Sequence, residues 1–164
     1  MDMMMFGRAM DILAKFYLPE GIFLQEIKDY SISELTMTAR FNVPHVAHKR
    51  IHQPLDYVTC EEYHLCLAQL SYVFIGSLIF DRILDFSFIT FDKFQELMLG
   101  SKMRLRRIVE LWYIRGVGKL TDFELTFHLD CVQKPESRRK FALLKVSIRG
   151  TLRGQLEFFI PVKN

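Results

Sequence analysis

Carboxylates, a hydroxyl and a thiol cluster in residues 57–62, Tyr-Val-Thr-Cys-Glu-Glu, immediately before a long apolar segment. Glu61 or Glu62 has the chemistry to hold or deprotonate a water molecule, as a general base does in hydrolysis. Thr59 stands three residues before Glu62, which is the spacing of a helix capping box. A capping role for Glu62 therefore competes with a catalytic one, because one rotamer cannot fully serve both.

Two further polar residues lie on the same predicted helix. Gln69 stands seven residues after Glu62, two helical turns on and on the same side. Its amide would either satisfy backbone groups in the core, as most buried amides do, or line a channel for an apolar substrate. His64 would either flank the active site or make a polar contact in the core.

Three histidines, His45, His48 and His52, raise the question of a metal site, with Cys60 nearby. Their i, i+3, i+7 spacing would place three imidazoles on one face of a helix. Two basic residues lie among them, however, and no paired cysteine motif accompanies them. Exposed loop histidines are the simpler interpretation, so we predict neither a metal site nor a cofactor.

The polar cluster begins a predicted central helix over residues 57–83. Its stretch Tyr63 to Phe80 carries no charge over eighteen residues, the threshold length for a membrane span, but a core helix would look the same. A shorter helix is predicted over residues 91–99, capped by Thr90. An apolar stripe within residues 1–18 predicts an N-terminal helix that docks on the core rather than lying on a membrane surface.

The rest of the chain is predicted to form strands. Residues 43–56 contain two prolines and no sustained period, which predicts an irregular loop. Alternation of apolar and polar residues and turn signals place six strands, at residues 21–32, 34–42, 101–115, 119–132, 138–149 and 151–162. A long antiparallel sheet and a helix that is apolar nearly all round can bury each other's apolar surface. We therefore predict a single α+β domain over residues 1–164, a sheet wrapped around the central helix, without a membrane span.

Composition narrows the class of protein. The chain has 164 residues, 13% of them aromatic, and a net charge of only +3 without a lysine-rich tail. This composition predicts one ring-filled core and gives little support for nucleic-acid binding. Cys60, Cys66 and Cys131 are an odd number without paired spacing, which predicts free thiols and a cytoplasmic location.

The pattern Glu-x-x-x-Cys-x-x-Gln-Leu-x-Tyr is met by Glu62, Cys66, Gln69, Leu70 and Tyr72. Together with residues 91–108 and 113–131, it resembles the FcoT-like acyl-CoA thioesterases, a hot-dog family. The resemblance implies a hot-dog fold and hydrolysis of fatty acyl thioesters carried on coenzyme A or an acyl-carrier protein. It also implies that the thioester carbonyl faces the start of the central helix, and that two copies pair as a homodimer with each active site across the interface.

The resemblance also suggests roles for individual residues. The catalytic candidates are Glu62, Glu61 and Thr59; the substrate-binding candidates are Tyr57, Cys60, Gln69 and His52. The family carries asparagines where this chain has Thr59 and Ala68. Related hydroxyacyl-thioester dehydratases carry a carboxylate where this chain has Leu65, although His52 lies in a loop that suits their histidine.

Three interpretations follow. Retention of Glu62 and Gln69 favours a thioesterase, whereas Ala68 and Leu65 favour a non-catalytic domain that binds acyl chains or lipids. A dehydratase-like lyase is the third alternative, disfavoured by Leu65.

Overall fold

The computed structural model describes residues 3–43, 58–83, 86–100, 104–113, 122–136 and 141–161. Within these residues the fold is α+β, with a six-stranded antiparallel sheet and three α-helices. The helices are α1 (Met3–Leu13), α2 (Cys60–Phe80) and α3 (Phe91–Leu99), and a 3-10 turn, η1, spans Pro19–Gly21. The strands are β1 (Leu24–Ser31), β2 (Thr36–Asn42), β3 (Arg104–Tyr113), β4 (Asp122–Gln133), β5 (Phe141–Gly150) and β6 (Leu152–Pro161).

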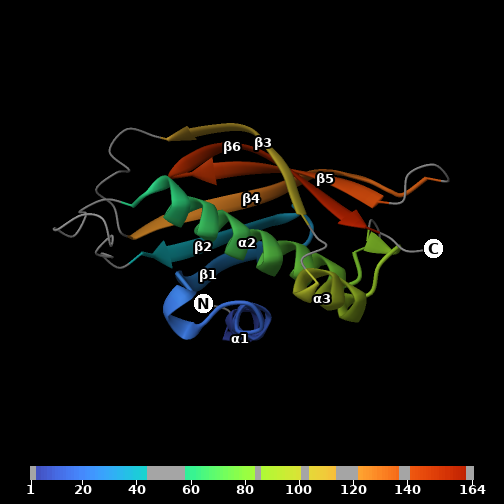
Figure 1. Cartoon of the computed structure of the whole chain (residues 1–164), viewed down its shortest axis with the longest axis horizontal. Coiled ribbons are helices and arrows are strands. Elements are labelled where there is room, and N and C mark those ends of the chain that lie inside the picture. The colour runs from blue at the N-terminus through green and yellow to red at the C-terminus, as the bar shows by residue number, and fades with distance from the viewer. Residues whose placement is uncertain are drawn as a thin grey trace.

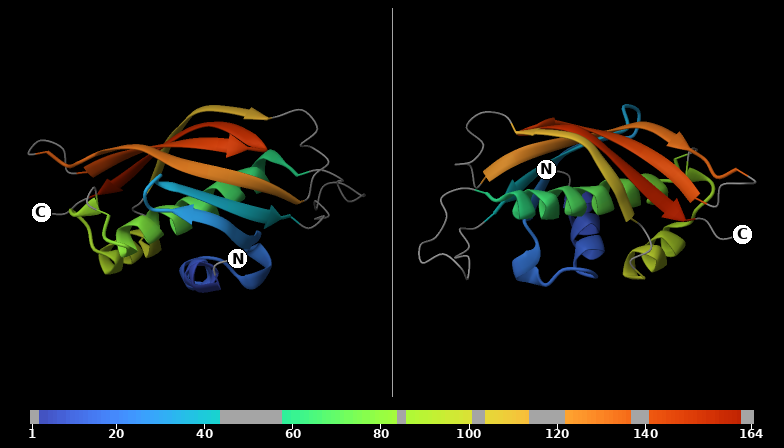
Figure 2. Two further views of the ribbon diagram at one scale, coloured as in Figure 1. Left: turned by 180° about the vertical axis from the view of Figure 1, so that it is seen from behind. Right: turned by 45° about the horizontal axis from the view of Figure 1, so that its top comes forward.

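The sheet curves over α2 and has the strand order β1-β2-β4-β5-β6-β3 (Figure 1). The chain leaves β2, forms α2 and α3, and returns as β3 at the far edge of the sheet beside β6. Helices α1 and α3 lie on the side of α2 that faces away from the sheet (Figure 2). The central helix is therefore enclosed by the sheet on one side and partly by two helices on the other.

Helix α2 is apolar because most of it is interior. Thirteen of its residues are buried, including both serines of its second half. It is long and apolar enough to cross a membrane, yet 72% of its most apolar eighteen-residue window is buried inside the fold. The helix is shorter than the predicted range 57–83, because it begins after Thr59 and ends before Asp81.

The hairpin between β1 and β2 differs from the prediction. Residues 34–42 were expected to form one strand with Leu35 in the alternating pattern, but β2 begins at Thr36. Ser31 pairs with Thr36, so the connection needs four residues and Leu35 lies in the turn with a φ of 52°. The Leu35 side chain still packs against the core from the turn. For this reason Leu35 fits the alternating apolar pattern of the strand although it is not part of it.

The predicted turn at Gly150 is present, and it requires glycine. Gly150 has a φ of +113°. A Cβ atom at this position would lie 2.5 Å from the carbonyl oxygen of Glu124 in the neighbouring strand. The turn therefore depends on a conformation and a close approach that other residues do not tolerate.

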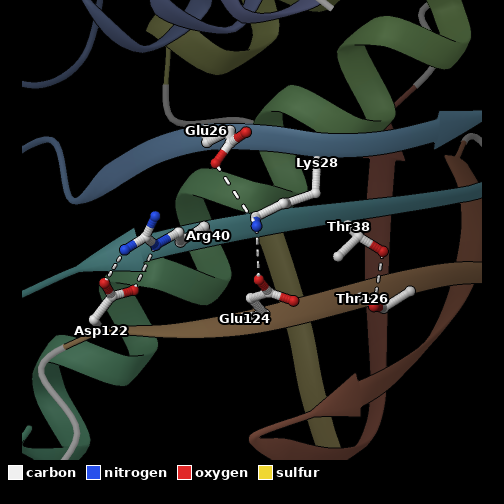
Figure 3. A network of polar contacts seen from close by, with 7 residues as sticks. All are labelled: Glu26, Lys28, Thr38, Arg40, Asp122, Glu124 and Thr126. Atoms are coloured by element: carbon white, nitrogen blue, oxygen red, sulfur yellow. Dashed lines mark hydrogen bonds and ion pairs between the residues drawn. The ribbon is translucent and has the colours of Figure 1, made fainter. Parts of the chain in front are cut away.

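The convex face of the sheet carries paired polar side chains (Figure 3). Arg40 bonds to Asp122 across β2 and β4, and Lys28 lies 3.2 Å from Glu124. Thr38 and Thr126, which are cross-strand partners, share a hydrogen bond of 2.9 Å. These polar pairs lie on the outer face of the sheet, whereas its apolar side chains face α2.

An ionic contact joins helix α1 to the end of α2. The Arg8 guanidinium donates to both carboxylate oxygens of Asp81 at 3.0 Å, and lies 4.1 Å from the centre of the Phe80 ring. The Tyr30 hydroxyl donates to the same carboxylate at 2.8 Å. The side chain of Asp81 thus joins α1, α2 and β1.

Candidate functional site

The first turn of α2 forms the capping box that the sequence predicts. The backbone N–H of Glu62 donates to Thr59 Oγ1 at 3.3 Å, and the backbone N–H of Thr59 donates to Glu62 Oε2 at 2.7 Å. This exchange satisfies two of the N–H groups that every helix start leaves without an intrahelical partner. Glu62 therefore serves the structural role, at least through Oε2.

A groove runs along one face of α2 beside β6. Its walls are His64, Leu67, Ala68, Ser71 and Tyr72 from α2, and Leu156 and Phe158 from β6, and it encloses about 50 Å³. The α2 residues recur at intervals of three and four, which places them on one face of the helix. The lining is apolar except for an imidazole, a hydroxyl and a phenol, and the Ser71 hydroxyl donates to the carbonyl oxygen of Leu67 at 2.6 Å.

The two adjacent glutamates lie on different sides of the helix. Glu61 stands three residues before His64 and seven before Ala68, so it lies on the groove side, and it is exposed. Glu62 stands four residues before Cys66 and seven before Gln69, both fully buried on the core side. Of the two predicted carboxylates, Glu61 has the better position to reach a ligand in the groove.

Cys60 also lies on the groove side. It is exposed, and its Sγ lies 4.0 Å from Nδ1 of His64, one turn further along. Cys60, Glu61 and His64 form a polar group where the groove meets the helix start. The common face of these three residues was not predicted from the sequence, although each residue was named as a candidate.

Of the two roles predicted for Gln69, the structure shows the first: its amide satisfies backbone groups in the core and does not line the groove. It is fully buried, and its Oε1 accepts hydrogen bonds from the backbone N–H groups of Phe23 at 3.0 Å and Leu24 at 3.3 Å. Its Nε2 donates to the carbonyl oxygen of Gly21 at 2.7 Å. The amide fastens the start of β1 to α2, on the side of the helix opposite the groove.

Burial keeps the hydroxyl and thiol groups around α2 in their neutral forms. Burial, reinforced by the nearby Glu62, raises the pKa of the Cys66 thiol far above its usual value. Burial, with Cys66 and Glu62, raises the pKa of Tyr63 to about 12, and burial raises the pKa of Tyr72. At neutral pH Cys66 is thus an inert thiol, and Tyr72 can donate a hydrogen bond into the groove.

Two predicted binding residues, Tyr57 and His52, lie outside the described residues, as do His45 and His48. Across the described parts of the chain, no group of three or more histidine, cysteine, aspartate or glutamate side chains could share a metal ion.

The β6 side of the groove was not predicted. The α2 side carries a signal in the sequence, since residues 60, 64, 68 and 72 follow one another at helical spacing. Leu156 and Phe158 carry no such signal, because only the packing of β6 against α2 brings them there.

Compared with known families and with curated proteins, the chain matches no family model and no individual protein.

Proposed function

We propose that this chain is a hot-dog domain that hydrolyses fatty acyl thioesters carried on coenzyme A or an acyl-carrier protein. One observation carries the proposal: an apolar groove follows α2 from His64 onward, one turn after the polar start of that helix. A fatty acyl thioester has the matching pattern, with one polar reacting group and one apolar chain.

The architecture supports the hot-dog assignment. The sheet curves around α2, which the sequence resemblance to FcoT-like thioesterases also implies. Burial of α2 under the sheet explains its apolar length without a membrane. We further propose a cytoplasmic location, in keeping with three cysteines that form no disulfide with one another.

The helix start can stabilise the charge that develops during hydrolysis. Attack of water on the thioester carbonyl places negative charge on its oxygen, and the positive end of the α2 dipole favours charge there. The backbone N–H of Glu61 donates to no acceptor among the described residues, so it is a candidate oxyanion donor. In the proposed site, the thioester carbonyl lies above Cys60 and Glu61.

The exposed polar residues Cys60, Glu61 and His64 near the start of the groove include the general base. Glu61 takes a proton from water as the hydroxyl oxygen bonds to the acyl carbon, and the His64 imidazole lies on the same side of the helix. The carbon–sulfur bond then breaks, the thiol sulfur receives the proton, and a free acid and a thiol leave. Thr59 acts indirectly in this scheme, because its hydroxyl caps the helix that presents the N–H donors.

The groove of one chain has room for only part of an acyl group, since about 50 Å³ holds a few atoms. This supports the proposal that two copies pair and that the second copy completes the site. Strand β3 is the free edge of the sheet next to β6, and Val109 and Trp112 on it are 44% and 65% exposed. An edge strand with exposed apolar side chains is suited to pair with the same strand of a second copy.

Hydrolysis of acyl-CoA substrates with short, medium and long chains tests the proposal, with release of free coenzyme A as the readout. We expect turnover on medium or long chains. Glu61→Gln should lower kcat about a hundredfold, because it removes the carboxylate on the groove side. Glu62→Gln is the matched control: glutamine can still close the capping box with Thr59, so both the free energy of unfolding and kcat should change far less.

A second candidate function is a non-catalytic domain that binds acyl chains. The observation that favours it is the apolar character of the exposed α2 surface, where Leu65 is 41% exposed and Ala68 lines the groove. Saturable acyl-CoA binding without any release of coenzyme A would establish this function in place of hydrolysis. Hydration of an enoyl thioester would instead point to the dehydratase-like lyase, for which Leu65 supplies no carboxylate.

A further inference from the structure

A second, larger cleft lies at the other end of α2, where the chain turns into α3. It encloses about 750 Å³, which is within the usual size of small-molecule sites. Its lining consists of Ile79, Phe80, Arg82, Ile83, Phe86, Ser87, Ile89, Thr90, Phe91 and Asp92. None of these residues belongs to the groove beside β6.

Close packing in the middle of α2 separates the two sites. A Cβ atom at Gly76 would lie 3.0 Å from the Phe94 ring and 3.2 Å from Cδ1 of Ile12. Helices α1 and α3 therefore approach α2 tightly at this point, between the groove residues that end at Tyr72 and the cleft residues that begin at Ile79. A ligand in the cleft would not be an extension of an acyl chain in the groove.

The cleft has an apolar floor and a polar rim. Ile79 and Phe86 are buried beneath it, and the ring of Phe80 is 48% exposed. The rim carries one cation, Arg82, and one anion, Asp92, both exposed. The Arg8 guanidinium, which lies over the Phe80 ring, is already bound to Asp81, so Arg82 supplies the available guanidinium. An apolar floor beside it suits an apolar chain with a singly charged head group, whereas Asp92 disfavours a more highly charged one.

Arg82 occupies a backbone position where glycine would be less strained. Its φ is 55°, and it ends α2 in a Schellman arrangement, with Ile83 N–H donating to Leu78 O and Arg82 N–H donating to Ile79 O, both at 3.1 Å. Glycine is the usual residue at this position, because other residues pay a steric penalty there. The guanidinium makes no hydrogen bond or ion pair with any residue that the structure describes, so no contact within the described fold explains the arginine.

We propose that this cleft binds a single-chain aliphatic carboxylate, with the chain over the apolar floor and the carboxylate on the Arg82 guanidinium. Guanidinium and carboxylate form paired hydrogen bonds, which fix the head group at the rim. Ser87 and Thr90 place hydroxyls on the same rim. The proposal does not rest on hydrolysis of thioesters in the groove.

Titration calorimetry with dodecanoate, below its micellar concentration, tests the proposal. The titration is run on Ala68→Trp, which fills the groove beside β6, so that only the cleft remains open. We expect one dodecanoate per chain. Adding Arg82→Gly should weaken dodecanoate binding at least about tenfold and leave binding of uncharged dodecanol unchanged. Arg82→Gly should also raise the urea midpoint of unfolding, since it relieves the left-handed arginine.

Equal dodecanoate affinity with and without Arg82→Gly would overturn the proposal, as would the absence of dodecanoate binding. Binding to anionic phospholipid vesicles in preference to dodecanoate would also overturn it, because the ligand would then be a membrane surface. Ser87→Trp in the otherwise unchanged chain is a second variant that fills the cleft and should remove one dodecanoate site. Thioester hydrolysis should survive Arg82→Gly, so the two proposals can fail separately.

Discussion

Adjacent residues of the same type have different roles at the start of α2. Successive side chains on a helix point about 100° apart, so Glu61 and Glu62 cannot share a face. Glu62 closes the capping box with Thr59, whereas Glu61 is exposed on the side of His64 and the groove. The chemistry of a carboxylate is therefore not enough to identify the catalytic residue, because its direction on the helix decides what it can reach.

Gln69 gives the clearest prediction at the scale of a single residue. Gln69→Leu keeps the side chain close in size but leaves Gly21 O, Phe23 N–H and Leu24 N–H without their amide partner. Buried polar groups that lose a partner are costly, so we expect the free energy of unfolding to fall by about 3 kcal/mol. Urea denaturation followed by circular dichroism measures the change.

Gln25→Leu is the matched control, because Gln25 is exposed on β1 close to the same junction. It should change the free energy of unfolding by no more than about 0.5 kcal/mol. A similar loss in both variants would mean that the Gln69 hydrogen bonds contribute little to stability.

At the scale of elements, α2 organises the molecule along its whole length. Its first half lines the groove from His64 to Tyr72, its middle packs against α1 and α3, and its last turn borders the second cleft. The middle depends on Gly76, which lets both outer helices come close. The tight contact makes α1 and α3 part of the core instead of loose additions to its surface.

Two glycine substitutions test this arrangement of helices. Gly76→Val adds a branched side chain where even a Cβ atom crowds Phe94 and Ile12, and we expect it to destabilise the fold by about 2 kcal/mol or more. Gly7→Ala adds a methyl group to α1 where nothing lies within 4 Å. This variant should stabilise the protein by about 0.5–1 kcal/mol through helix propensity alone.

Thermal and urea unfolding of both variants provide the measurement. If Gly76→Val unfolded at the same urea concentration as the unmodified chain, the close packing of α1 and α3 on α2 would be incorrect. A loss of stability in Gly7→Ala would show that α1 makes contacts at Gly7 that the structure does not have.

At the scale of the whole molecule, we propose that copies associate along the β3 edge of the sheet. The convex face carries ion pairs such as Arg40 with Asp122, whereas β3 exposes Val109 and Trp112. We expect a homodimer that joins two sheets along β3. Light scattering after size exclusion should give twice the 19.4 kDa of one chain.

Val109→Lys combined with Trp112→Lys should convert this dimer to a monomer, because lysines on an edge strand oppose pairing with another strand. The matched control is Arg153→Lys on β6, which keeps an exposed cation and should leave the dimer intact. A dimer that survives the double substitution would place the interface elsewhere. A monomer that keeps full thioesterase activity would show that one copy forms the complete site.

The sequence predicted the elements better than the site. The apolar residues Phe123, Leu125 and Phe127 alternate with polar ones and predicted strand β4. In a half-buried strand every second side chain faces the core. The capping box of Thr59 and Glu62 could also be predicted from the sequence, because the two residues are only three positions apart. The β1–β2 turn was misplaced by a few residues, because Leu35 keeps its apolar contact from a turn as well as from a strand.

The sequence by itself determined the α+β class, the polar start of α2 and the apolar length behind it, because these depend on residues close together in the chain. Only the tertiary structure decided that Gln69 binds the backbone of Gly21 and Phe23, that Glu61 and not Glu62 lies on the groove side with β6, and that Arg82 stands over an apolar cleft. The first two facts depend on contacts between distant segments, which form when the sheet closes over α2. The third depends on how residues 79–92 fold between α2 and α3.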